Sequence, residues 1–209
     1  TVMDEDVMMI TADFGAISNS STSRQRQLGV NLRVGSHRFD NRNFIGRGTS
    51  RTERATIPIE DDTEVLRRSL WLATDRAFKQ AAEDISAKRA ALEKQIDTGD
   101  ILDDFSPEAV ETYEDNPISM DLVRAEWEQK LRAASLLFRN YPKIETSEIN
   151  LRAIVATRYY LDSEKRRITL RKLLFNIEVR ASATTPDGQT IQQKMTLEEN
   201  DTSFLPTEE

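Results

Sequence analysis

The stretch EDDTEVLRRSLWLATDRAFKQAAEDISAKRAALEKQ (60–95) predicts a long α-helix. It contains no Pro or Gly, and Asp62 or Thr63 can cap its start, where acidic residues suit the positive end of the helix dipole. The apolar positions that share one helical face are Leu66, Leu70, Ala73, Ala77, Ala81, Ile85 and Leu92, with Trp71 and Phe78 at the margin. We therefore expect a helix that buries this face against another layer.

Alternating apolar residues before this helix predict antiparallel strands. Residues 8–16 alternate, and residues 28–34 alternate again after the polar stretch NSSTSRQRQ (19–27). We expect a hairpin with residues 19–27 as its long loop. Glycines and asparagines in 40–54 predict a second loop, and a short strand is expected at 55–59.

The chain after residue 118 predicts a second helix and then more sheet. Ser119 or Asp121 can cap a helix that runs to about Arg139. Its expected buried stripe is Val123, Trp127, Leu131, Ala134 and Phe138. Alternation then predicts strands at 149–161, 168–170, 175–183 and 191–197, with turns at 162–165 and 186–189. The sum is an α+β fold, a largely antiparallel or mixed β-sheet with two main α-helices packed on it, formed by residues 1–209 as a single domain.

Charge is distributed unevenly along the chain. The net charge is −7, yet residues 23–58 hold eight arginines, two acids and no lysine, which we call the arginine strip. Residues 97–121 hold nine carboxylates and no Lys or Arg, and an acidic loop is expected at about 97–118. The acidic balance disfavours nucleic acid as a partner. The arginine strip can face phosphates, substrate carboxylates or the acidic half of the chain itself, which is the most common outcome for such runs.

The composition argues against several kinds of catalytic site. There is one histidine, His37, and no cysteine, whereas transition-metal sites need three or four such ligands. His37 and Asp40 supply two ligands at most. DTGDILDD (97–104) lacks the spacing of a calcium loop, and GRGTSR (46–51) lacks the lysine and helix of a phosphate loop. We predict no catalytic residue, no cofactor and no metal site in this chain. A hydrolase that uses paired carboxylates is a third, minor hypothesis, because 36 acids give such a pair no specificity.

The ends and the hydropathy of the chain bear on its context. No apolar run reaches the length of a membrane span. The first ten residues lack the pattern of a signal peptide and do not begin with Met, so we expect the chain to start inside a longer protein or after processing.

Several stretches together resemble the N-terminal region of TldD/PmbA-type proteins, a family described as candidate modulators of DNA gyrase and as zinc metallopeptidases. The stretches are RVGSHRFDNRNF (33–44), IPIEDDTEVLRRSLWLATDRAFKQA (57–81), AKRAALEKQ (87–95), DDFS (103–106) and RYYLDSEKRRI (158–168). The similarity is to the longer, divergent members and extends in the same order over nearly the whole chain. The family has a glycine where this chain has Lys165, which argues against a positive-φ turn at that position.

The resemblance implies a non-catalytic domain of a larger protein. In the family, zinc is held in a C-terminal domain by a His-Glu-x-x-x-His helix, and that motif is absent here. The domain is expected to shape substrate access and support dimer contacts, with the missing C-terminal domain, a second subunit in a homo- or heterodimer, and the peptide substrate of the full-length protein as partners. The residues predicted to face substrate or partner are Arg33, His37, Arg38, Arg42, Arg47 and Arg51. The alternative is a stand-alone protein–protein interaction module. Divergent members favour an exported or periplasmic parent, with a cytoplasmic one as the alternative.

Overall fold

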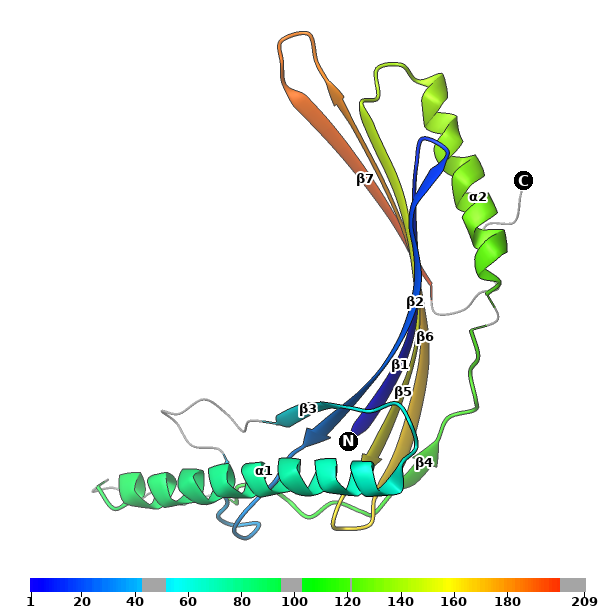
Figure 1. Ribbon diagram of the computed structural model, residues 1–209. Helices are drawn as coiled ribbons and strands as arrows, with labels where there is room; N and C mark the ends of the chain where they lie inside the picture. The colour runs from blue at the N-terminus through cyan, green and yellow to red at the C-terminus, as the bar shows by residue number, and fades with distance from the viewer. Residues whose placement is uncertain (43–51, 95–102, 121, 200–209) are drawn as a thin grey trace. The chain divides into compact units, whose positions relative to one another are not determined.

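The computed structural model describes residues 1–42, 52–94, 103–120 and 122–199 (Figure 1). Within these residues the elements are β1 (Val2–Asp13), β2 (Ala16–Val30), β3 (Glu53–Ile57), α1 (Thr63–Leu92), β4 (Thr112–Glu114), α2 (Arg124–Leu136), the 3-10 turn η1 (Leu137–Asn140), β5 (Thr146–Leu161), β6 (Arg167–Thr184) and β7 (Thr190–Glu199). The strand order is β3-β2-β1-β5-β6-β4, and β7 also pairs with β6. The sheet is mostly antiparallel, so the predicted α+β class is confirmed.

The chain divides into two compact units. Unit 1 comprises Thr1–Met3, Gln25–Tyr113 and Arg158–Ile168, and unit 2 comprises Asp4–Arg24, Glu114–Thr157 and Thr169–Glu209. The long strands β1, β2, β5 and β6 each contribute residues to both units. Each unit has its own cluster of buried apolar side chains.

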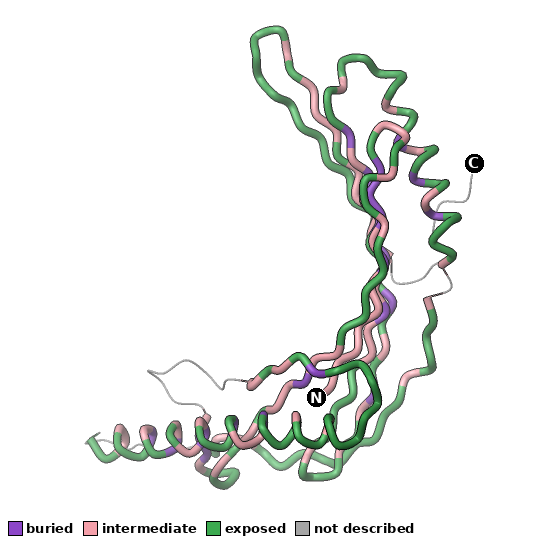
Figure 2. The backbone as a smooth tube through the Cα atoms, in the orientation of Figure 1, coloured by how far each residue is buried: buried purple, intermediate pink, exposed green. Residues whose placement is uncertain are grey.

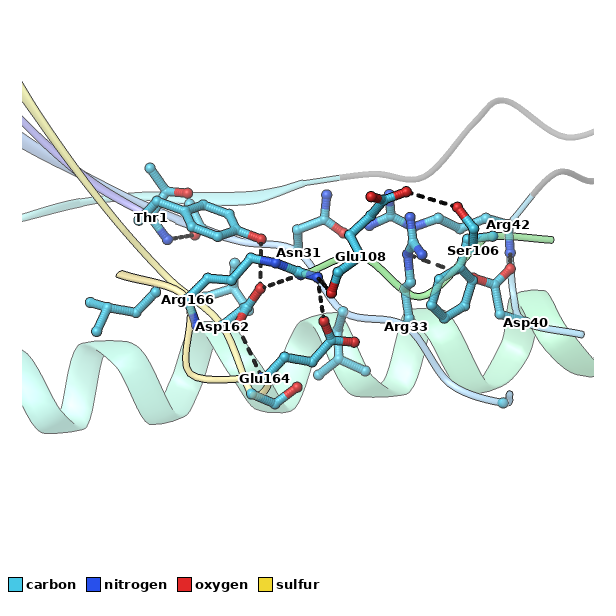
Figure 3. A pocket seen from close by; sticks show the side chains of 18 of the residues that line it. Thr1, Asn31, Arg33, Asp40, Arg42, Ser106, Glu108, Asp162, Glu164 and Arg166 are labelled. Atoms are coloured by element: carbon cyan, nitrogen blue, oxygen red, sulfur yellow. Dashed lines mark hydrogen bonds and ion pairs between the residues drawn. The ribbon is translucent and has the colours of Figure 1, made fainter. Parts of the chain in front are cut away.

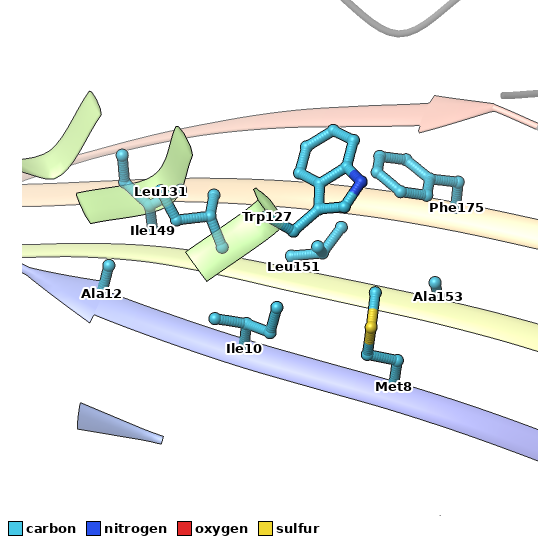
Figure 4. Close-up of a cluster of buried hydrophobic side chains, with 9 residues drawn as sticks. All are labelled: Met8, Ile10, Ala12, Trp127, Leu131, Ile149, Leu151, Ala153 and Phe175. Atoms are coloured by element: carbon cyan, nitrogen blue, oxygen red, sulfur yellow. The ribbon is translucent and has the colours of Figure 1, made fainter. Parts of the chain in front are cut away.

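The core of unit 2 lies between α2 and one face of the sheet (Figures 1 and 4). Alternate residues of the strands point toward the helix, as the period of two requires. Trp127 of α2 packs against Phe175 of β6, with their ring centroids 5.1 Å apart and tilted by 57°. The other buried members are Met8, Ile10, Ala12, Leu131, Ile149, Leu151 and Ala153. The alternating apolar side chains predicted in β1 and β5 therefore form the surface on which α2 packs.

The hairpin of β1 and β2 turns at Phe14-Gly15, not at the polar stretch 19–27. Both turn residues have positive φ, 42° and 83°, as a two-residue hairpin turn requires. The prediction of a long loop was wrong because residues 19–27 are mostly solvent-exposed and carry no apolar alternation. Their strand conformation comes from pairing with β1, which an isolated stretch of sequence does not reveal.

Buried serine side chains hold this turn in place. Ser135 of α2 accepts a hydrogen bond from the Gly15 amide at 2.9 Å, and Ser147 accepts one from the Phe14 amide at 3.3 Å. The Ser147 hydroxyl in turn donates to Asp13 Oδ1 at 2.9 Å. Backbone groups that the turn leaves unpaired are thus satisfied inside unit 2.

The α1 helix packs in unit 1 with a narrower apolar face than predicted. Asp62 is its N-cap, as expected, and accepts from the amides of Glu64 and Val65 at 2.9 and 3.1 Å. Its buried residues are Ala73, Ala77, Ala81, Ile85 and Lys88, separated along the helix by half-buried and exposed positions (Figure 2). Leu70 and Trp71 are 49% and 64% exposed, so they do not belong to the core. Small alanines let the helix approach its neighbours, while the bulky residues stay at the surface.

The second helix starts later than the sequence suggests. Its N-cap is Val123, which makes no side-chain capping bond, so the prediction of Ser119 or Asp121 as the cap was wrong for Ser119. Asp121 lies outside the described residues. The acidic stretch contains the short strand β4, which pairs with β6. Among the described residues, neither helix has both the length and the apolar character needed to span a membrane.

The Phe14-Gly15 turn gives a test of packing against backbone strain. A Cβ at Gly15 would lie 2.8 Å from Leu136 Cδ1, whereas a Cβ at Gly188, which has nearly the same φ of 85°, would meet nothing within 4 Å. We expect Gly188→Ala to cost about 1 kcal/mol in the free energy of unfolding from the left-handed conformation alone. Gly15→Ala should cost about 1–3 kcal/mol more because of overpacking. Urea titration of both variants measures the difference, and equal costs would show that Leu136 moves away freely.

Candidate functional site

A polar pocket of about 890 Å³ lies within unit 1 (Figure 3). Most of its lining comes from three segments that are distant in sequence: residues 29–42 from the end of β2 onward, residues 105–108, and the turn between β5 and β6 at 160–166. Thr1 and Leu70 complete the lining. The charged side chains that line it are Arg33, Asp40, Arg42, Glu108, Asp162, Glu164 and Arg166. Such a concentration of charge in a hollow is a candidate for recognising a polar ligand.

A buried ion pair between Lys88 and Asp104 binds the backbone of two residues that line the pocket. Lys88 of α1 is only 5% exposed, and its Nζ lies 2.5 Å from Asp104 Oδ2. The same ammonium donates to the carbonyl oxygen of Arg42 at 2.7 Å, and the same Asp104 oxygen accepts from the Asp40 amide at 2.6 Å. Lys88 and Asp104 therefore join α1 to the segments that carry Asp40 and Arg42.

The loop between Gly35 and Asp40 depends on its glycine. Gly35 has φ 128° and pairs with Asp40 as an isolated antiparallel bridge. A Cβ at Gly35 would lie 2.2 Å from the carbonyl oxygen of Phe39, so no larger residue fits without moving the backbone. The tight loop places Asp40 next to Arg33 and Arg42.

Arg33 and Arg42 lie next to each other on one side of the pocket, as Figure 3 shows. The Arg33 guanidinium stacks over Phe105 at 3.9 Å, and its Nε is 3.7 Å from Asp40 Oδ2, which is too long for a hydrogen bond. Asp40 is 1% exposed, and its Oδ1 accepts from the Arg42 amide at 2.7 Å. Burial, followed by the positive charge of Arg33, lowers the pKa of Arg42. The positive charge of the Arg42 guanidinium is therefore only partly balanced by negative charge around it.

The opposite wall is a hairpin turn held by Asp162 and Arg166. Asp162 Oδ1 accepts from the amides of Glu164 and Arg166, both at 3.0 Å, and Asp162 Oδ2 pairs with Arg166 Nη1 at 2.9 Å. Arg166 also pairs with Glu164 at 2.6 Å and donates to the carbonyl oxygen of Glu108 at 2.9 Å. Burial, and then the negative charge of Asp162, raises the pKa of Tyr160, so this phenol stays protonated. The charged side chains of this wall, Asp162, Glu164 and Arg166, thus all form hydrogen bonds or ion pairs.

Lys165 adopts the positive-φ conformation that its sequence argued against. Its φ is 73°, in the left-handed region that glycine normally occupies. The Asp162 bonds to the amides on either side of Lys165 hold the turn in this conformation. The doubt about a positive-φ turn was therefore wrong, because a neighbouring side chain imposes the backbone conformation that the residue itself disfavours.

The predicted surface residues fall into three groups. Arg33 and Arg42 line the pocket. His37 stays outside the lining, stacks on Phe105 with ring centroids 4.5 Å apart, and its carbonyl oxygen accepts from the Phe105 amide at 3.1 Å. Arg38 is exposed and does not line the pocket. Arg47 and Arg51 lie outside the described residues.

Several residues of the site were not predicted from the sequence. Lys88 lies toward the end of a helical pattern, and Asp104 and Phe105 lie in a stretch for which the sequence predicted only an acidic loop. Asp162 and Arg166 lie at the turn that the sequence predicted at 162–165, but no function was predicted for either residue. The DDFS stretch of the family resemblance (103–106), which includes both residues, was the signal that could have pointed to Asp104 and Phe105. In the part of the chain that the structure describes, no group of three or more His, Asp or Glu side chains is placed to hold a metal ion.

Comparison with known proteins gives similarity at the level of structure. No family model and no curated protein sequence matches this chain. TldE from Thermococcus kodakarensis matches 96% of this chain with a TM-score of 0.50 and 11% sequence identity. The chain shares the fold of part of TldE. The expected resemblance to TldD/PmbA-type proteins is thus confirmed as a likeness of fold.

The match leaves most of TldE uncovered. This chain spans 39% of the TldE chain. A candidate DNA gyrase modulator from Thermotoga maritima matches 98% of this chain, with 9% identity, a TM-score of 0.46 and 40% of its own length covered.

The Lys88–Asp104 pair provides a test of what holds the site together. Lys88→Met leaves the Asp104 carboxylate, which is 11% exposed, without its cation, and should cost about 3–5 kcal/mol in the free energy of unfolding. The matched control on the same helix is Lys79→Met, which removes an exposed pair with Asp75 and should cost about 0–1 kcal/mol. Similar losses in urea titrations of the two variants would mean that the buried pair organises nothing.

The Lys165 turn provides a second test. Lys165→Gly should increase the free energy of unfolding by about 1 kcal/mol, because glycine tolerates the left-handed conformation. Lys165→Ala keeps the backbone penalty while removing the side chain, so it should give no gain. A gain in both variants, measured by urea titration, would assign the effect to the lysine side chain instead of its φ angle.

Proposed function

We propose that this chain is a non-catalytic domain of a TldD/PmbA-like protein, in which it shapes the access of a peptide substrate to a catalytic domain. The observation that carries the proposal is the match with TldE, which takes in 96% of this chain and 39% of TldE. A chain of this length can supply the fold of one part of such a protein. The zinc-binding machinery that the family resemblance implies then belongs to another domain of the parent protein.

The composition supports a non-catalytic role. One histidine and no cysteine leave only carboxylates as abundant metal ligands, and catalytic zinc sites are built mainly from imidazole and thiolate with at most one carboxylate in the common sets. Three of the four acidic groups that line the pocket are engaged with partners inside unit 1: Asp162 and Glu164 bind Arg166, and Glu108 accepts from Ser106 at 2.9 Å. Groups committed in this way favour recognition over acid–base chemistry.

The exposed apolar side of α1 supports a contact role. Trp71 and Phe78 are 64% and 53% exposed and lie seven residues apart, so they share a helix face. Large exposed aromatic residues are common at protein–protein contacts. We propose that this face contacts the catalytic domain or the second subunit of a dimer.

The alternative is a stand-alone interaction module that captures a protein partner without any catalytic domain. The same exposed aromatic residues of α1 favour it. The two hypotheses differ in the partner that they predict. A domain of a larger protein should bind the region encoded downstream in its own reading frame. A stand-alone interaction module should bind an unrelated protein tightly.

Metal content and proteolysis test the non-catalytic role. We expect residues 1–209, purified in the presence of zinc, to hold well below one zinc per chain by elemental analysis and to cleave no peptide in a substrate library. Added to the separately produced downstream domain of the same gene, the chain should change the size preference of peptide cleavage. A stoichiometric zinc together with chelator-sensitive cleavage by this chain alone would contradict the proposal.

A further inference from the structure

Two buried polar atoms of the described residues have no hydrogen-bond partner, and both belong to residues that line the pocket of unit 1. They are Asp40 Oδ2 and Arg42 Nε. Buried polar groups are nearly always paired, because an unpaired one loses its hydration without compensation. One of these atoms is an acceptor and the other a donor. Their shared location suggests that the pocket is built for a ligand that offers both.

The charges around these atoms are unequal. Arg166 is neutralised by Asp162 and Glu164, and Lys88 by Asp104. The remaining charged side chains of the lining are Arg33, Arg42, Asp40 and Glu108, and Glu108 accepts from the Ser106 hydroxyl. Arg33 forms an ion pair with Asp40, whereas Arg42 Nε has no hydrogen-bond partner among the described residues. Arg42 is therefore a cation of the lining without an ion-pair partner among the described residues.

We propose that the pocket binds the C-terminal end of a peptide, with the terminal carboxylate between Arg33 and Arg42 and the last amide N–H donated to Asp40. A guanidinium binds a planar carboxylate through paired, charge-assisted hydrogen bonds. The terminal residue of a peptide carries this carboxylate and an amide N–H close together. The inference rests on the proposed function, in which a peptide is the substrate, and it adds which end of the peptide is recognised.

The structure favours a peptide end over a simple inorganic anion. Inorganic phosphate carries more negative charge near neutral pH than a single carboxylate does, and it would be repelled more strongly by Asp40 and by Glu108 in the same lining. A ligand reaches Asp40 when Arg33 moves aside. This movement breaks no hydrogen bond, because the Arg33–Asp40 contact is 3.7 Å long and the Arg33 side chain is 41% exposed. The same movement takes Arg33 off the ring of Phe105, which then gives the peptide side chain an apolar surface to contact.

Titration of the chain with small peptides tests the proposal. The probes are N-acetyl-Ala-Ala with a free carboxylate, the same dipeptide with a C-terminal amide, acetate and inorganic phosphate, each followed by NMR shifts of the arginine side chains and by calorimetry. We expect saturable binding of the free acid, and binding of the amide and of phosphate weaker by about tenfold or more. Binding of the acid should weaken as salt is added, because the contacts are ionic.

Three variants locate the site. Arg42→Gln should weaken binding of the free acid by about tenfold or more, because it removes the unpaired cation. Asp40→Asn should weaken the dipeptide acid but not acetate, which has no amide to donate. Arg38→Gln is the matched control, since Arg38 is an exposed arginine of the same segment outside the lining, and it should bind like the unaltered chain. Thermal unfolding checks each variant, and Arg33→Gln replaces Asp40→Asn if the latter does not fold.

The outcomes separate this inference from the proposed function. If the unaltered chain does not bind the free acid, if it binds acid and amide equally, or if phosphate binds best, the peptide-end site is wrong. None of these results changes the zinc content or the effect on a separate catalytic domain, which test the non-catalytic role independently. Equal weakening by Arg38→Gln and Arg42→Gln would also overturn the site, because it would show a diffuse effect of charge.

Discussion

The Lys88–Asp104 ion pair is the interaction on which the candidate site depends. Taking an ammonium and a carboxylate out of water is unfavourable, and the loss is offset only when both ions have additional partners. Lys88 finds the Arg42 carbonyl oxygen, and Asp104 finds the Asp40 amide. The pair therefore does more than neutralise charge: it brings the loop after β2 and the segment after α1 together, so that Arg33, Asp40 and Arg42 meet in one pocket.

The two units use different means to hold their segments. Unit 2 relies on an apolar core between α2 and the sheet, and it adds two serine hydroxyls at the β1–β2 turn. Unit 1 has a small apolar cluster around Leu28, Ile57 and Ala73, and its loops are held mainly by ionic and polar contacts. Polar contacts fix direction better than apolar ones, because hydrogen bonds weaken steeply with angle. This suits a unit whose pocket presents charged groups at defined positions.

The errors of the sequence interpretation have a common physical origin. Residues 19–27 form a strand although they carry no apolar pattern, because the partner strand β1 supplies their backbone hydrogen bonds. Lys165 takes a positive φ because the Asp162 carboxylate binds the amides around it. Leu70 was assigned to the core by its helical spacing, but the contact surface of α1 is narrower and follows the alanines. In each case a contact with another part of the chain outweighed the local preference.

The amino-acid sequence alone determined the α+β class, the long capped helix, the apolar alternation of β1 and β5, and the scarcity of metal ligands, because these follow from periodicity and composition. It also marked Arg33 and Arg42, through the density of arginines around them. Only the tertiary structure decided that these two arginines share a pocket with a buried aspartate, while Arg38 faces solvent. The reason is that their neighbours Lys88, Asp104 and Phe105 lie 46 or more residues away from Arg42 along the chain, and such contacts are set by the folded arrangement of the backbone and not by any local pattern.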